Sequence, residues 1–167
     1  MITTLLVSIC LAFSSPGDID TKAYRQSFFS IDSEEEAVDF ELFCRDHAQD
    51  SPVGLAYAGW SKTRLAEFGM NPFSKWSHFS EGRDQIEEAI ALEENNPEIR
   101  LIRLSIQLHA PDFLGYNSQI EFDKQKVVSA LKSGWLQEDA LFKKQVIQFM
   151  MELSDLSESE KAALKAL

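Results

Sequence analysis

The sequence predicts an all-α protein, and three observations support this fold class. No stretch alternates apolar and polar residues over a strand's length, and no Asn-Gly or Asp-Gly hairpin turn occurs. Three pairs, Ser51-Pro52, Asn71-Pro72 and Asn96-Pro97, place a capping residue directly before proline, the pattern that opens a helix. Between these pairs, apolar residues recur at helical spacing. We expect about six or seven helices, joined by short connections into stacked antiparallel hairpins.

In the first half of the chain, four helices are expected in order. A short one covers 21–29, and the next follows Ser33 and Glu36, which have the spacing of a capping box. The third runs from 52 to 68 and stops at Gly69, and the fourth covers 72–92. In the fourth, Gly82 falls on the apolar side, which predicts either a close approach of another helix backbone or a kink.

The second half begins with a helix over 97–109 that is apolar nearly all round and therefore mostly buried. Pro111 ends it, and Phe113, Leu114 and Tyr116 are expected to fold back onto the core. Ser118 and Glu121 predict a capping box for a helix that stops at Gly134. Apolar periodicity predicts two further helices, over 136–153 and 157–167.

The N-terminal residues have the character of a secretory signal. An apolar-to-small run extends from Leu5 to Phe13, too short to span a bilayer, and no Lys or Arg precedes it. We interpret residues 1–14 as a signal peptide and 15–167 as a single helical domain, exported to the periplasm, the cell envelope or the medium. The mature chain would have no transmembrane span, and Cys44 would be its only cysteine.

The charge of the chain limits its partners. The 167 residues carry a formal net charge of -11, with 44% hydrophobic and 26% charged residues, as in a soluble globular domain. An acidic surface repels phosphate backbones and anionic lipid, so nucleic acid is not expected as a partner.

Two arginines interrupt the apolar helix over 97–109. Arg100 and Arg103 lie on one narrow polar stripe, and a buried guanidinium group requires water or a carboxylate. Carboxylate partners could come from four acidic residues, and the stripe would then be a structural salt-bridge network. The alternative is an anion or peptide-carboxylate site. The four candidate acids are Glu87, Glu94, Asp112 and Asp123.

Catalytic and metal-binding patterns are weak. No nucleophile motif, zinc-protease motif or glycine-rich phosphate loop occurs. His47, His78 and His109 each precede an acid by three residues, but two of them fall at expected helix ends, where the helix dipole favours histidine without a ligand. We expect no metal and no cofactor.

Two resemblances support a helical-hairpin stack. The stretch "IEEAIALEENNPEIRLIRL", with Ala89, Asn95, Asn96 and Pro97-Glu98, resembles the junction between two tetratricopeptide repeats, although the family's first-helix residues are missing. Over residues 50–132 the chain is also similar to small exported helical proteins of the Bacteroidetes type. The shared residues are Asn71, Pro72, Lys75, Phe79, Gly82, Glu98 to Arg100, and Pro111 to Tyr116. The first resemblance implies a tetratricopeptide-like bundle, and the second implies export but no activity.

These observations favour a binding protein over an enzyme. We expect an exported interaction or scaffold module that binds a protein or peptide. The expected contact surface is a groove formed by Tyr57, Trp60, Trp76, Arg100 and Arg103. The alternative is a small metal-dependent or hydrolytic envelope enzyme that uses His78 and nearby acids.

Overall fold

The computed structural model describes residues 21–47, 51–153 and 156–167. Within these residues the regular structure is eight α-helices and one short 3-10 helix, without strands. The all-α prediction is confirmed, with slightly more helices than the six or seven expected. The elements are α1 (Lys22–Phe28), α2 (Glu34–His47), α3 (Pro52–Phe68), α4 (Pro72–Leu92), α5 (Pro97–His109), η2 (Asp112–Leu114), α6 (Ile120–Lys132), α7 (Ala140–Met151) and α8 (Glu158–Lys165).

The three cap-proline starts are confirmed. The side chains of Ser51, Asn71 and Asn96 each accept a hydrogen bond from a backbone amide in the first turn of the following helix, at 2.9 Å. Each cap satisfies a backbone donor that the helix itself leaves free. The starts of α3, α4 and α5 are therefore set by local sequence.

The start of α6 is set differently from the prediction. No side chain caps this helix, so the expected capping box of Ser118 and Glu121 does not form. Instead, the backbone N–H of Gln119 donates a hydrogen bond to Oε1 of Gln107 on α5, at 3.0 Å. A contact between two helices thus replaces the local cap.

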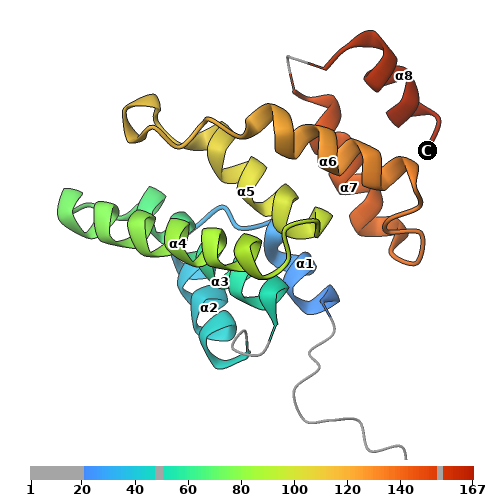
Figure 1. Ribbon diagram of the computed structural model, residues 1–167. Helices are drawn as coiled ribbons and strands as arrows, with labels where there is room; N and C mark the ends of the chain where they lie inside the picture. Colours follow the sequence, from blue (N-terminus) through green and yellow to red (C-terminus); the bar gives the residue numbers. More distant parts are fainter. Residues whose placement is uncertain (1–20, 48–50, 154–155) are drawn as a thin grey trace, which may run out of the picture.

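Helices α3 and α4 form the longest hairpin, and α2 lies along α3 (Figure 1). A Cβ atom on Gly59 would lie 2.6 Å from the carbonyl oxygen of Gly82, so the two backbones touch where these glycines face each other. Close approach, the first of the two predictions for Gly82, is confirmed. The hairpin packs without a side chain at its tightest point.

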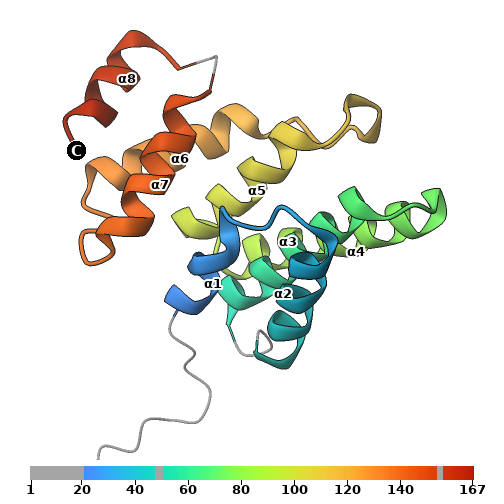
Figure 2. The same cartoon turned by 180° about the vertical axis from the view of Figure 1, so that it is seen from behind.

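Helix α5 lies across this hairpin and joins it to the C-terminal helices. All residues from Glu98 to Gln107 are buried, as expected for a helix that is apolar nearly all round. Helix α6 runs beside α5, and α7 and α8 follow at the far end of the molecule (Figures 1 and 2). None of the described helices combines the length and apolar character required to cross a bilayer.

An aromatic cluster fills the core between α1, α3 and α7. The rings of Tyr24 and Tyr57 stack with centroids 5.2 Å apart, and those of Phe28 and Trp60 lie 4.9 Å apart. Phe29 contacts Phe149 of α7 at 5.7 Å. Helix α1 and the adjacent Phe29 therefore pack against both α3 and α7, and they connect the α3–α4 hairpin to the C-terminal helices.

Candidate functional site

The five residues expected to share a groove lie in three places. Trp60 and Trp76 both line one apolar groove at the surface. Tyr57 is fully buried and faces Glu98. Arg100 and Arg103 are 3% and 5% exposed and point toward α6. The lining of this groove thus includes both tryptophans but neither the tyrosine nor the two arginines.

The carboxylate of Asp123 on α6 accepts hydrogen bonds from both arginines. Arg103 binds it with two hydrogen bonds, from Nε at 2.7 Å and from Nη2 at 2.9 Å, and Arg100 Nη1 lies 3.2 Å from Oδ1. Gln107 donates a further bond at 2.9 Å. The Asp123 side chain has no exposed area. The polar stripe of α5 is therefore the face that packs on α6.

The remaining guanidinium nitrogens of the two arginines also have hydrogen-bond partners. Arg103 Nη1 reaches Glu87 on α4 at 3.0 Å, and Arg100 donates twice to the backbone carbonyl of Glu94, at 2.6 and 2.8 Å. Burial alone would lower the pKa of Arg103, but the hydrogen bonds and charges of Asp123 and Glu87 raise it. The charges of Arg100 and Arg103 are balanced by the carboxylates of Asp123 and Glu87, so no positive charge remains to attract an anion. The geometry therefore supports the structural salt-bridge network.

A second buried network surrounds Glu98 in the first turn of α5. Its carboxylate accepts hydrogen bonds from the Tyr57 hydroxyl at 2.8 Å and from Arg25 Nε at 2.9 Å. Arg25 also reaches Asp139, at 3.1 Å, so one guanidinium joins α1, α5 and the start of α7. Burial and the adjacent Glu98 charge raise the pKa of Tyr57, which keeps its hydroxyl protonated as a donor.

The groove that contains the two tryptophans is the candidate functional site. Its volume is about 700 Å³, within the range of binding clefts. One wall is the N-terminal half of α4, with Trp76 and Phe79, and the other is the end of α5 together with η2, including Phe113. Figures 1 and 2 show both walls projecting from the same side of the molecule. We call this site the aromatic groove.

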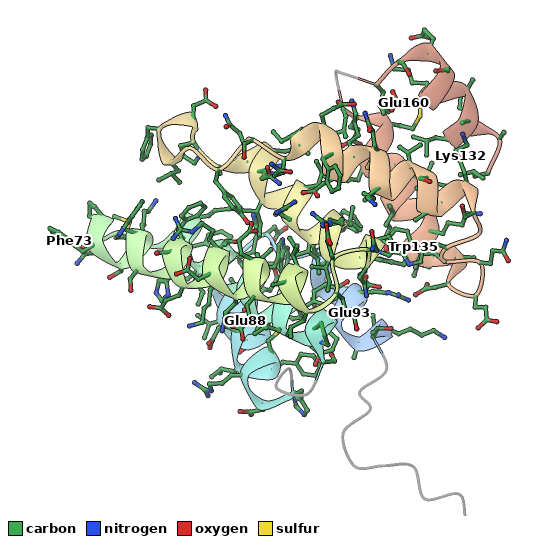
Figure 3. The ribbon with its side chains drawn as sticks, viewed as in Figure 1. Phe73, Glu88, Glu93, Lys132, Trp135 and Glu160 are labelled. Atoms are coloured by element: carbon green, nitrogen blue, oxygen red, sulfur yellow. The ribbon has the colours of Figure 1, made fainter. Side chains whose placement is uncertain are left out.

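The first two turns of the α4 wall are exposed to solvent. Residues 71–77 are all exposed, and burial begins only at His78 and Phe79. Phe73 lies at this free end, directed away from the body (Figure 3). Two exposed apolar side chains line the groove, Phe113 at 86% and Trp76 at 55%, and two more, Met70 at 96% and Phe73 at 86%, lie within two residues of the lining residue Pro72. Such clustering of exposed apolar groups is typical of an interaction site.

Two basic side chains and one acidic side chain line the groove beside these aromatic groups: Arg64, Lys75 and Glu67. Arg64 pairs with Glu67 and donates to the carbonyl of Ile31 at 2.7 Å, while its Nε is buried without a partner among the described atoms. Lys75 donates to the backbone carbonyl of Glu67 at 3.2 Å. The groove therefore combines apolar walls with a small, slightly cationic polar border.

Phe113 is the groove residue whose position the sequence did not predict. We expected Phe113, Leu114 and Tyr116 to fold back onto the core, and Leu114 and Tyr116 do pack against it. The Tyr116 hydroxyl donates to Glu87 at 2.6 Å, and Gly115 adopts a left-handed φ of 64°. This turn and anchor leave Phe113 on the outside, at the groove mouth.

The three histidines lie on three different helices. His47 and His109 end α2 and α5, as expected, and the Nδ1 atom of each lies within hydrogen-bond distance of a carbonyl oxygen four residues earlier, at 2.8 and 2.6 Å. His78 is within α4, and the nearby Glu81 is bound by Lys62 at 2.8 Å. Within the described ranges, no three His, Cys, Asp or Glu side chains are placed to share a metal ion.

Comparisons with protein-family models, with curated proteins and with solved structures found no significant match. The function therefore has to be inferred from the groove itself.

Proposed function

We propose that this protein is a protein-interaction module whose contact surface is the aromatic groove. The observation that carries the proposal is an apolar cleft of about 700 Å³ whose lining includes the exposed Phe113 and Trp76, with the exposed Met70 and Phe73 within two residues of the lining residue Pro72. The partner would be a protein segment that presents apolar side chains, aromatic ones included.

The apolar surface extends beyond the cleft. Phe73 is exposed beside the groove and is not one of its lining residues. A small ligand held in the cleft would leave Phe73 in water, whereas a protein segment can fill the cleft and cover its border together. The extent of the apolar surface therefore favours a macromolecular partner.

Local charge also favours docking at this face. The chain as a whole has a net charge of -11, but residues 52–80 contain three basic side chains, Lys62, Arg64 and Lys75, and one acidic side chain, Glu67. The groove is thus built partly from a stretch that has a small excess of basic side chains. Another acidic protein could approach here with little repulsion.

The proposal also includes the cellular location of the protein and the type of its helical architecture. Residues 1–14 lie outside the described residues, and their composition supports export to the periplasm, cell envelope or medium. We also propose that α3, α4 and α5 form a tetratricopeptide-like stack of hairpins. In such a stack, the surface between neighbouring helices binds the partner, and here that surface would be the groove.

Photocrosslinking tests the proposal. Phe73→p-benzoylphenylalanine places a crosslinker at the groove mouth, and Leu141→p-benzoylphenylalanine places one on α7 at a similarly exposed position, 71%. In the cells that make the protein, ultraviolet light should give a discrete protein adduct at position 73 and none at position 141. Equal adducts at both positions, or none at either, would contradict the proposal.

A further inference from the structure

We infer that Met70 is an oxidation site of this protein, and that conversion of its thioether to the sulfoxide weakens docking at the aromatic groove. The second part of this inference rests on the proposed function, because it concerns the regulation of the same groove.

Met70 is far more exposed than the other methionines of the described residues. Its side chain is almost fully exposed, whereas Met150 is fully buried and Met151 is half-buried. An oxidant must reach the sulfur atom, so the susceptibility of a methionine follows the exposure of its side chain. Hydrogen peroxide should therefore react with Met70 well before it reacts with Met150.

The reaction needs no catalytic group of the protein. The sulfur atom donates an electron pair to one oxygen of hydrogen peroxide, the S–O bond forms as the O–O bond breaks, and the other oxygen leaves with both protons as water. The sulfur is oxidised and the peroxide is reduced. Sulfoxide reductases restore the thioether, so the modification is reversible.

The fold should tolerate this change, because the Met70 side chain is not part of the described apolar core. The residue lies in the connection between α3 and α4, and this connection is held by other groups. The backbone N–H of Gly69 donates to the carbonyl of Leu65 at 3.1 Å, and the side chain of Asn71 caps α4. Oxidation of the thioether leaves both of these contacts in place.

The same connection borders the aromatic groove. Glu67 precedes Met70 by three residues and Pro72 follows it by two, and both of these residues line the groove. A Cβ atom on Gly69 would lie 3.4 Å from Cγ of Lys75, which is another lining residue. A partner segment that covers this border of the groove would therefore meet the Met70 side chain.

Oxidation changes the chemistry of that border. The thioether of Met70 is apolar and flexible, and it can pack against an apolar partner. The sulfoxide oxygen is polar and hydrated, and an apolar partner would remove its water without replacing the hydrogen bonds. Docking should therefore weaken while the fold is kept.

Peptide mapping of the purified protein after peroxide treatment tests the oxidation site. Trypsin places Met70 on peptide 65–75, apart from Met150 and Met151 on peptide 145–161. Met70 should gain one oxygen at least about tenfold faster than Met150, with an unchanged circular dichroism spectrum, and the two rates should become equal in urea-unfolded protein. Equal rates in the native protein, or loss of helical signal on oxidation of Met70, would overturn the inference.

Photocrosslinking from Phe73→p-benzoylphenylalanine, with and without peroxide treatment of the cells that make the protein, tests the effect on docking. Peroxide should lower the adduct about threefold or more in the chain that has Met70. Met70→Leu keeps an apolar side chain of similar size without sulfur, so its adduct should not change. Met70→Gln, whose amide is polar like the sulfoxide, should lower the adduct without peroxide.

The outcomes separate this inference from the proposed function. An adduct at position 73 that is unaffected by oxidation of Met70, or that peroxide lowers equally in Met70→Leu, would overturn the inference and leave the proposed function standing. Absence of an adduct in untreated cells would refute the proposed function and the regulation of docking together. The peptide map would still decide whether Met70 is the oxidation site.

Discussion

At the residue scale, buried charge determines how the helices are held together. Asp123 has no exposed area and binds two arginines and a glutamine from α5, while Glu98 binds a tyrosine and an arginine from α3 and α1. Burying a carboxylate is costly unless its charge is neutralised and its oxygens are hydrogen-bonded. Both conditions are met at each site, so each network fixes one helix arrangement and disfavours others.

Asp123→Asn should destabilise the fold strongly. Among the described residues, the substitution removes the one carboxylate that pairs with Arg100 and one of the two that bind Arg103, and it leaves these guanidinium groups buried. Removing one partner of a buried pair costs about 3–5 kcal/mol of unfolding free energy. Urea denaturation followed by circular dichroism measures the change.

Asp84→Asn is the matched control for that experiment. Asp84 pairs with Arg83 at the surface, where its side chain is 66% exposed, so the loss should be below about 1 kcal/mol. If the two variants lose similar stability, the buried network is not what orders α5 on α6.

The arginine pairing could be predicted from the sequence only in part. Two buried guanidinium groups on an apolar helix require carboxylates, so Glu87 and Asp123 could be placed among the candidates. Asp112 was an equal candidate and is not a partner, because the choice depends on how α6 crosses α5. The roles of Arg25 and Glu98 were missed, since a contact between residues 73 positions apart leaves no local pattern.

At the element scale, helix boundaries follow local chemistry except where another helix intervenes. Helix α8 begins with a capping box of Ser157 and Glu160, whereas α6 begins at a hydrogen bond from Gln119 to Gln107. The groove could not be predicted in the same way. It depends on α4 extending past its packing partners and on Tyr116 anchoring the connection that carries Phe113.

Gly82→Ala should destabilise the α3–α4 hairpin although alanine is the better helix former. Alanine gains about 1 kcal/mol in helix propensity, but its Cβ would clash with the carbonyl oxygen of Gly59 and lie 2.8 Å from Cγ2 of Thr63. Separating the helices exposes packed surface, so a net loss of about 1–3 kcal/mol is expected. Thermal denaturation measures it.

A double substitution separates steric contact from a general effect of glycine. Gly59 and Gly82 meet at the same point, so once one substitution has pushed the helices apart, the second should cost less than it does alone. Ser77→Ala, at an exposed position of α4, is the control and should be neutral or slightly stabilising. Additive losses at the two glycines would show that the helices do not share one contact point.

At the scale of the whole molecule, stability should decrease from the central helix outward. Helix α5 is buried from Glu98 to Gln107 and takes part in both charge networks, whereas α8 buries only Leu164 of its own residues. The C-terminal helix is therefore held by a small apolar contact with α6 and α7, and it can open without disturbing the centre.

Hydrogen exchange should show this gradient. Amides in α5 should exchange at the rate of global unfolding, and those in α8 at least about a hundredfold faster, because local opening releases little buried surface. Leu164→Ala should accelerate exchange in α8 further and leave α5 unchanged, since Asp123 and Glu98 hold α5 independently of α8. Mass spectrometry of exchanged peptides measures both regions in one experiment. Equal acceleration in α5 would instead show that the two ends of the molecule unfold as one unit.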